Sequence, residues 1–343
     1  MGESRITPTA IRRGYGAMTK PARANHSDIR IGISGWRYTP WRGSFYPKGL
    51  VQKRELYFAS RTVNSIEING SFYALQNQER YQNWYDDTPD DFMFSVKGPK
   101  FITHIHRLRD VEQPISNFFA SGVLALKNKL GPILWQFPPT FKFDHDLFKA
   151  FLKLLPTTTD AAIQVAKENN IDVDVTQLQF SPKQRLRYSI EIRNESFRDE
   201  KFIHLLREFN VALVVADTAG RWPQLEDITS DFVYMRLHGD AELYKSGYTE
   251  EARNRWYKRI KCWSEGKQPE DAKLVTTKTN EPSSHRDVFC YFDNTDKLWA
   301  PQDARAVLEK LHLADNLEAE PGKRLASIMP KKKTKTETQA DLF

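Results

Sequence analysis

Short apolar runs rich in β-branched and aromatic residues recur along the chain, and most are separated by longer stretches with helical periodicity. The short runs predict strands, and the amphipathic stretches predict helices. The predicted strands cover residues 29–34, 63–69, 92–97, 132–137, 187–193, 211–217, 232–238 and 288–293. The predicted helices cover residues 50–61, 78–86, 111–127, 146–155, 200–209, 250–263 and 301–311.

Eight predicted strands that alternate with helices indicate a parallel sheet, because parallel neighbours need a crossover that a helix usually supplies. Eight strands also close a barrel that its own side chains can fill. An open, doubly wound sheet is the alternative, but nothing resembles the Gly-rich turn that binds dinucleotides in such sheets. We therefore predict an α/β fold, a single (β/α)8 TIM-barrel domain over residues 29–315.

Three segments fall outside this regular alternation. Residues 1–28 are predicted to be a flexible leader, and residues 157–184 a helical insertion with its helix at 161–169. Residues 316–343 are predicted to be a disordered tail that carries a basic cluster of Lys331, Lys332, Lys333 and Lys335. Much of the formal net charge of +7 lies in these tails, so it permits an anionic partner without demanding one.

Composition narrows the class of protein. No apolar run approaches the ~20 residues that a membrane-spanning helix needs, and no apolar signal segment follows the first basic residues. The only cysteines, Cys262 and Cys290, have no metal-ligand spacing and cannot form a disulfide framework. We therefore expect a cytoplasmic protein with no membrane partner.

Polar and ionisable residues stand at the ends of most predicted strands. A buried parallel strand is normally apolar throughout, because unpaired charges inside a protein cost several kcal/mol. Barrel enzymes build their sites where the strands end, so these side chains predict a polar pocket at the barrel mouth. The alternative is a structural ring of ion pairs, Glu67 and Glu191 against Arg193 and Arg236, that closes the mouth.

The alternation within two strands places Glu67 with Asn69, and Glu191 with Arg193, on the same side of each strand. Two inward carboxylates suit a general acid and base, or metal ligands, and we take Glu67 and Glu191 as candidate catalytic residues. The remaining candidates would bind substrate, with the lysine, arginine and histidine side chains suited to phosphate or carboxylate. They are Ser34, Trp36, Asn69, Lys97, His104, Gln136, Arg193, Asp217, Arg236, His238 and Asn294.

Two loop features leave alternatives open. His104 and His106 follow the third strand, where a metal pair is conceivable, but no third ligand is near in sequence, so we assign no metal site and no cofactor. Aromatic residues crowd the first two loops and suit either stacking on bases or sugars or a hydrophobic plug. These residues are Trp36, Trp41, Phe45, Tyr46, Phe72 and Tyr73.

Several ordered blocks resemble the YecE-like family, catalogued as a domain of unknown function (number 72). The resemblance runs from about residue 29 to residue 311 and implies a TIM barrel, while the family implies no settled activity. Thr295 stands where the family pattern often has another acidic residue, with Asp296 one position later. The blocks are S-G-W at 34–36, F-Y-P at 45–47, E-I-N-x-S-F-Y at 67–73, K-x-P at 97–99, I-T-H at 102–104, L-G-P-I-L-W-Q-F-P-P at 130–139, E-I-R-x-x-S-F at 191–197, Y-M-R-L-H-G at 234–239 and Y-F-D-N at 291–294.

The chain ends in Gln339-Ala340-Asp341-Leu342-Phe343, which resembles the short peptide by which bacterial replication and DNA repair proteins dock on the DNA polymerase sliding clamp. Gln339, Leu342 and Phe343 would make the contacts, and a flexible basic tail suits their presentation. A solvated tail that happens to end in two apolar residues is the alternative.

These features support one leading hypothesis and two others. The leading hypothesis is an enzyme or ligand-binding barrel that is recruited to DNA by its tail. Its substrate would bear a phosphate or carboxylate group, a class that includes nucleic acid. The others are a non-catalytic nucleic-acid-binding or scaffold barrel, and a metal-dependent hydrolase or isomerase of a sugar-like molecule. Open glutamates would favour an enzyme, whereas glutamates fully occupied by arginines would favour a structural role.

Overall fold

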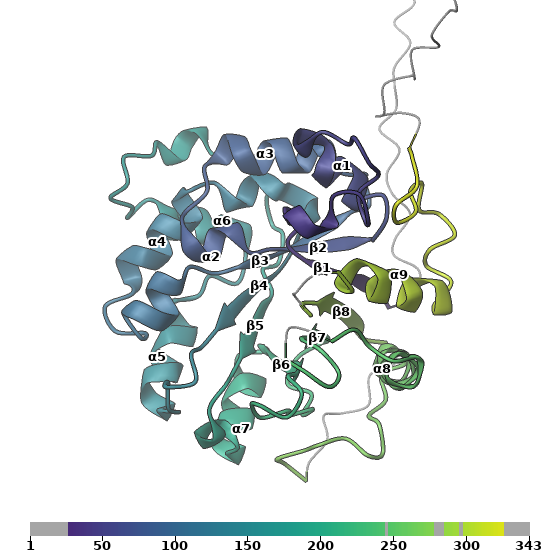
Figure 1. The fold of residues 1–343 in the computed structure, drawn as a ribbon. Helices are drawn as coiled ribbons and strands as arrows, with labels where there is room; N and C mark the ends of the chain where they lie inside the picture. Colours follow the sequence, from purple (N-terminus) through teal and green to yellow (C-terminus); the bar gives the residue numbers. More distant parts are fainter. Residues whose placement is uncertain (1–26, 244–245, 278–284, 295–297, 326–343) are drawn as a thin grey trace, which may run out of the picture.

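The computed structural model describes residues 27–243, 246–277, 285–294 and 298–325, and its strands close into one parallel barrel (Figure 1). The strands follow sequence order around the barrel, and β1 pairs with both β2 and β8. This confirms the predicted closed α/β barrel. The strands are β1 Ile29–Ser34, β2 Ser65–Ile68, β3 Met93–Lys97, β4 Leu130–Gln136, β5 Tyr188–Glu191, β6 Ala212–Asp217, β7 Phe232–Leu237 and β8 Asp287–Phe292.

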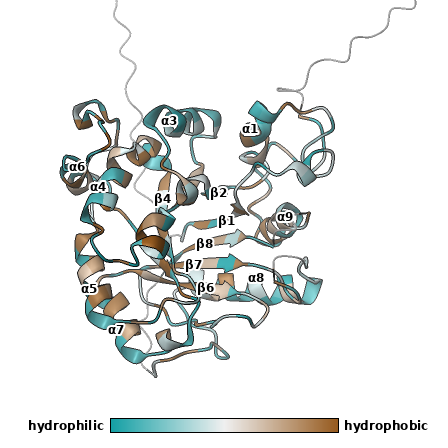
Figure 2. Ribbon diagram, turned by 60° about the vertical axis from the view of Figure 1, so that its left-hand side comes forward, coloured by the Kyte–Doolittle hydropathy of each residue, from teal (hydrophilic) through white to brown (hydrophobic). Residues whose placement is uncertain are grey.

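Helices surround the barrel, and most of the longer ones begin at a side chain that caps them. Asn77, Asp144, Thr158, Asp199 and Thr249 each accept a hydrogen bond from a backbone N–H in the first helical turn. The helices are α1 Glu55–Ala59, α2 Gly70–Tyr73, α3 Gln78–Asp87, α4 Glu112–Ala120, α5 His145–Leu154, α6 Thr159–Ala166, α7 Glu200–Glu208, α8 Glu250–Ser264 and α9 Ala300–Lys310. In Figure 2, α3 is mostly hydrophilic, whereas α5 shows hydrophobic turns.

Two expected boundaries were wrong. The helix predicted over 111–127 ends at Ala120, because Gly122 adopts a left-handed conformation (φ 108°) and a 3-10 segment follows. The domain also continues past residue 315: Ala319 is buried and its N–H donates to the carbonyl of Arg61. The tail beyond residue 325, with its terminal peptide, and leader residues 1–26 lie outside the described residues.

The buried side chains form two apolar clusters, one between the barrel and its helices and a smaller one inside the barrel. The inner cluster shares the barrel with hydroxyl groups that pair across it. Ser65 bonds Tyr291 through their hydroxyls at 2.8 Å, and Ser95 bonds Tyr234 at 2.7 Å. The Tyr234 hydroxyl also lies 2.7 Å from the Glu67 carboxylate, so polar contacts extend from the barrel centre to its mouth.

Gly32, in the middle of β1, has a steric reason to be glycine. A Cβ at this position would lie 1.9 Å from the Ser65 carbonyl oxygen on the neighbouring strand. No side chain fits at that distance, so the close pairing of β1 with β2 depends on Gly32.

Candidate functional site

Side chains from the ends of four strands meet at the barrel mouth. Glu67 comes from β2, Glu191 from β5 and Arg236 from β7, while His238 and Asp293 directly follow β7 and β8. We call these five residues the mouth cluster. The alternation of side chains along parallel strands directs them to the same interior space, as predicted for Glu67, Glu191, Arg236 and His238.

Arg236 is the centre of the mouth cluster and is only 1% exposed. Its Nε and Nη2 donate to the two Glu67 oxygens at 3.0 and 2.9 Å, and its Nη1 donates to Glu191 at 2.6 Å. Nη2 also donates to Asp293 at 2.6 Å, and Nη1 lies 3.3 Å from His238 Nε2. One guanidinium therefore holds three carboxylates from three different strand ends.

The charges in the cluster shift the pKa values of its members. Burial alone would raise the pKa of Glu191, but Arg236 and Arg193 hold it well below its usual range. Burial, the largest single effect on Asp293, would raise its pKa, but Arg236, His238 and Lys97 together lower it to about 2. Burial and Arg236 lower the pKa of His238, so this imidazole is neutral at pH 7.

Both glutamates are fully buried and occupied by cationic or hydroxyl donors. Glu67 accepts from Arg236, Tyr234 and Ser34, and Glu191 accepts from Arg236 and Arg193. Neither carboxylate can reach a substrate without breaking its buried ion pair with Arg236. The geometry matches the ion-pair ring and differs from the open carboxylate pair that acid–base roles need.

Four more of the expected site residues lie around the mouth cluster. Lys97 ends β3 and donates to Gln136 Oε1 at 2.5 Å, while its Nζ lies 4.2 Å from the centre of the Phe72 ring. Arg193 stacks on Trp222 at 4.0 Å and also binds Glu191. His104 is half-buried, and burial together with Lys97 lowers its pKa to about 4, which makes it neutral at pH 7.

Two expected site residues point away from the mouth. The Asp217 carboxylate accepts from the Tyr248 hydroxyl at 3.2 Å and from Trp256 Nε1 at 3.3 Å, between β6 and α8. Asn294 donates to Asp303 at 2.8 Å and lies in the same outer layer. Both connect the barrel to α8 and α9, so the structure does not bring them into the site.

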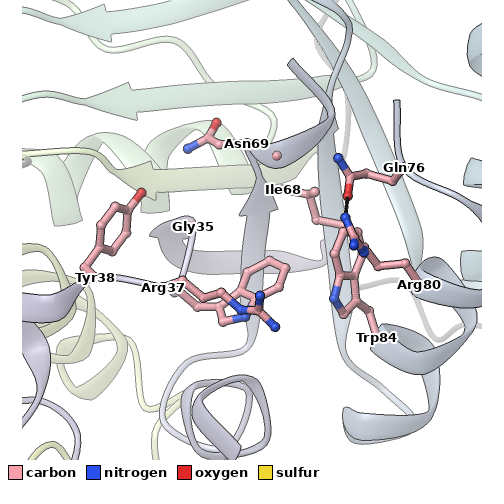
Figure 3. A pocket seen from close by; sticks show the side chains of 10 residues that line it. Gly35, Arg37, Tyr38, Ile68, Asn69, Gln76, Arg80 and Trp84 are labelled. Atoms are coloured by element: carbon pink, nitrogen blue, oxygen red, sulfur yellow. Dashed lines mark hydrogen bonds between the residues drawn. The ribbon is translucent and has the colours of Figure 1, made fainter. Parts of the chain in front are cut away.

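A cavity of about 350 Å³ lies beside the mouth cluster, between the loop after β1 and the segments that follow β2. We call it the β1–β2 pocket. Figure 3 shows Tyr38 and Asn69 on one side, with Gln76, Arg80 and Trp84 on the other. The complete lining is Gly35, Trp36, Arg37, Tyr38, Ile68, Asn69, Gly70, Gln76, Arg80 and Trp84.

Asn69 and Ser34 connect this pocket to the mouth cluster. Asn69 Nδ2 donates to Ser34 Oγ at 2.8 Å, and Ser34 in turn donates to Glu67. Asn69 Oδ1 is buried and accepts no hydrogen bond from the described part of the chain. A buried acceptor without a donor favours binding of a group that supplies one.

The arginines of the pocket were not predicted as site residues. Arg37 follows β1, and Arg80 belongs to α3, where it donates to Gln76 at 2.6 Å. The Trp36 and Trp84 rings pack edge to face at 5.2 Å and bring these two segments together. An adjoining cavity of about 310 Å³ shares both arginines and adds Lys53.

Most of the aromatic residues in the first two loops form a plug. Trp41, Phe45 and Tyr46 are buried, and the rings of Phe45 and Tyr46 pack against Phe58 at 5.7 and 5.8 Å. Trp36 lines the pocket, as expected of a substrate-binding residue, although only 7% of it is exposed. The hydrophobic-plug interpretation therefore describes this region better than the stacking wall.

Among the residues that the structure describes, no three His, Cys, Asp or Glu side chains are grouped to hold a metal ion. In the same described segments, no helix combines the length and apolar character needed to cross a membrane.

Comparison with known proteins identifies one family. The model of the family described as "Protein of unknown function DUF72" matches residues 30–325. UPF0759 protein YunF of Bacillus subtilis (strain 168) is 32% identical over 118 residues, which are 33% of this chain and 41% of YunF. UPF0759 protein YecE of Escherichia coli O157:H7 is 27% identical over 191 residues, which are 54% of this chain and 64% of YecE. The matches therefore span less than two thirds of these curated relatives.

Solved structures show the same fold at low sequence identity. A DUF72 family protein from Thermotoga maritima superposes with a TM-score of 0.62 at 21% identity, covering 83% of this chain and 99% of that one. One from Enterococcus faecalis gives 0.60 at 18% identity, covering 83% and 96%. At these identities the likeness concerns the fold alone.

Proposed function

The chain belongs to the DUF72 family, and on that premise we propose that its barrel binds a small phosphate- or carboxylate-bearing molecule in the β1–β2 pocket. The observation that carries the proposal is the lining, in which Arg37 and Arg80 share one cavity with the amide side chains of Asn69 and Gln76. Guanidinium groups suit phosphate and carboxylate because they donate two parallel hydrogen bonds.

The pocket suits an anion better than the mouth cluster does. In the cluster, Arg236 is surrounded by carboxylates that already use its donors, so an anion would have to displace Glu67 or Glu191. Arg37 and Arg80 are exposed to solvent. A ligand can therefore approach them without breaking a buried ion pair, which would cost about 3–5 kcal/mol.

The volume and the polar groups of the β1–β2 pocket indicate which kind of ligand it can bind. The volume of about 350 Å³ lies at the lower end of the range of small-molecule sites, roughly 300–1,000 Å³. The Asn69 Oδ1 acceptor favours a ligand with a hydroxyl group. We expect a polyol or sugar phosphate, or a hydroxy acid, to bind more tightly than orthophosphate or succinate.

Isothermal titration calorimetry tests this proposal with orthophosphate, glycerol phosphate, a hexose phosphate, succinate and malate. Arg37→Gln with Arg80→Gln should weaken binding at least tenfold, because a hydrogen bond to a charged group contributes about 1.5–3 kcal/mol. Arg185→Gln is the matched control, since Arg185 is an exposed arginine paired with Asp231 just before β5. Unchanged affinity in the double variant, or equal weakening in the control, would contradict the assignment.

We also propose that the terminal peptide Gln339–Phe343 docks on a bacterial DNA polymerase sliding clamp. Only the sequence supports this partner, because the peptide lies outside the described residues. Burying a leucine and a phenylalanine contributes roughly 1.5–3 kcal/mol each, and ordering the peptide offsets part of it, so micromolar affinity is expected.

Fluorescence anisotropy with the cognate clamp tests this partner. Leu342→Ala with Phe343→Ala should abolish clamp binding and leave ligand binding to the barrel unchanged. Equal clamp affinity of the full chain and a chain that ends at Pro330 would refute the docking proposal.

A further inference from the structure

Two buried lysines are held in different ways at opposite ends of the barrel. Lys129 lies just before β4, and its Nζ donates to the Tyr85 carbonyl, the Thr88 carbonyl and the Thr88 hydroxyl at 2.6, 2.8 and 3.2 Å. Lys97 ends β3 at the mouth, and within the described residues its Nζ has one hydrogen-bond acceptor, Gln136 Oε1. Lys129 thus has an acceptor for each ammonium proton, whereas Lys97 has one acceptor for three.

The surroundings of Lys97 also favour its neutral amine. The side chain is 8% exposed, so little water reaches the Nζ to accept the ammonium protons that Gln136 does not. The face of the Phe72 ring, 4.2 Å from the Nζ, attracts the ammonium but accepts no conventional hydrogen bond from it. Burial lowers the pKa of Lys97 to about 8, and Arg236 adds to the shift, while Glu191, Glu67 and Asp293 oppose it. The amine is therefore partly neutral at pH 7 and carries a lone pair.

We propose that Lys97 is a nucleophile that forms an imine with an aldehyde or ketone ligand at the barrel mouth. The amine nitrogen bonds to the carbonyl carbon, and the C–O bond breaks. Both protons of the neutral amine leave with the oxygen as water, so the step needs no oxidant or reductant. The imine nitrogen then takes a proton from solvent and withdraws electrons from the bonds next to the former carbonyl carbon.

The position of Lys97 fits a covalent role. It stands at the carboxyl end of a barrel strand, which is where barrel enzymes place reacting groups. The neighbouring carboxylates Glu191 and Asp293 lie close enough to affect its charge and favour a cationic imine once it forms. The inference concerns a different group from the pocket arginines and does not require that the β1–β2 pocket bind an anion.

Reductive trapping of the full-length protein tests the inference. Brief treatment with limiting glyoxylate and cyanoborohydride converts an imine-forming lysine to carboxymethyl-lysine, which peptide mass spectrometry locates. At about pH 7 roughly one in ten amines of pKa about 8 is neutral, against about one in 2,500 for an ordinary lysine. Limited access reduces this advantage, and we expect Lys97 to react at least about tenfold faster than the exposed Lys258 of α8.

The pH dependence of labelling shows whether Lys97 reacts because its amine is neutral or only because reagent reaches it. Between about pH 7 and pH 9 the ratio of Lys97 labelling to Lys258 labelling should fall about tenfold. An amine of pKa about 8 is roughly nine-tenths neutral at pH 9, whereas the neutral fraction of a model-peptide lysine still rises about tenfold per pH unit. Lys129 is the internal control for burial and should stay unlabelled. Lys97→Arg should lose the adduct and keep the labelling of Lys258. Labelling of Lys97 no faster than that of Lys258, or a ratio that does not change with pH, would overturn the proposal.

Discussion

Replacing Arg236 by methionine tests whether the mouth cluster is a structural ion network. Arg236 alone binds Glu67 through two hydrogen bonds and Glu191 through one, and both carboxylates are fully buried. Methionine is apolar and leaves these two carboxylates without their shared cation. The perturbation therefore removes the charge that stabilises them and leaves their own burial unchanged.

The expected loss is about 3–5 kcal/mol of unfolding free energy, the usual result of leaving a buried charge unpaired. For a domain of about 300 residues the unfolding entropy is roughly 0.6 kcal/mol/K, so this loss lowers Tm by roughly 5–8 °C. The matched control is Arg236→Met combined with Glu67→Gln and Glu191→Gln. It removes the stranded carboxylates and should recover much of the lost stability.

The loss should depend on pH in a defined direction. In the wild type the lowered pKa values of Glu191 and Asp293 add stability that is present above about pH 4–5 and is lost as pH falls through their folded-state values. In Arg236→Met burial raises the pKa of the same carboxyl groups, so they become protonated and less costly at mildly acidic pH. The destabilisation should be largest near pH 7 and shrink as pH falls toward about 4.

Urea denaturation followed by tryptophan fluorescence measures these free energies at each pH. A loss below about 1 kcal/mol for Arg236→Met at pH 7 would refute the structural role of the cluster. A loss that stays constant between pH 7 and pH 4, or a triple variant less stable than Arg236→Met alone, would refute its electrostatic explanation.

Three further predictions follow from buried contacts. Gly32→Ala should lower the unfolding free energy by about 3 kcal/mol or more, measured by urea denaturation, because its Cβ would lie 1.9 Å from a carbonyl oxygen; wild-type stability would contradict the strand geometry. Burial raises the pKa of Asp217, which means that the fold disfavours its charge, and an asparagine oxygen can accept the same hydrogen bonds; Asp217→Asn should therefore change Tm at pH 7 by no more than about 2 °C. Because Asp217 points away from the mouth, this variant should also leave the ligand affinity measured by calorimetry unaltered. Weaker ligand binding by Asp217→Asn would show that Asp217 contributes to the ligand site. Lys129→Met should lower the unfolding free energy by about 1–3 kcal/mol, because it leaves the carbonyl groups of Tyr85 and Thr88 without their hydrogen-bond donor. An unchanged midpoint in urea denaturation would refute this prediction.

The barrel could be predicted because its signal is local. Most of the apolar runs end in a polar residue, and the alternation around Glu67 and Glu191 correctly showed which residues share a face. The same argument failed for Asp217, because the β6 run is apolar on both faces and its alternation cannot be read. In the structure Ala216 faces the interior and Asp217 faces α8.

The candidate site was harder to predict, because its parts come together only through packing. Arg80 belongs to the hydrophilic helix α3 and has no strand-end signal, yet the contact between Trp36 and Trp84 brings it to the pocket. The sequence likewise showed that Arg236 and the two glutamates point into the barrel. It could not show that one guanidinium lies between both carboxylates, since that depends on distances across the barrel.

A crystal structure of the protein with the tightest ligand from the calorimetry panel tests the central claim most directly. That claim is that the β1–β2 pocket binds the ligand while the mouth cluster holds the barrel together. We predict that the phosphate or carboxylate group lies between Arg37 and Arg80, with a ligand hydroxyl on Asn69 and with the ion pairs of Arg236 intact. A ligand bound directly to Glu67 or Glu191, with Arg236 displaced and the pocket empty, would contradict the claim.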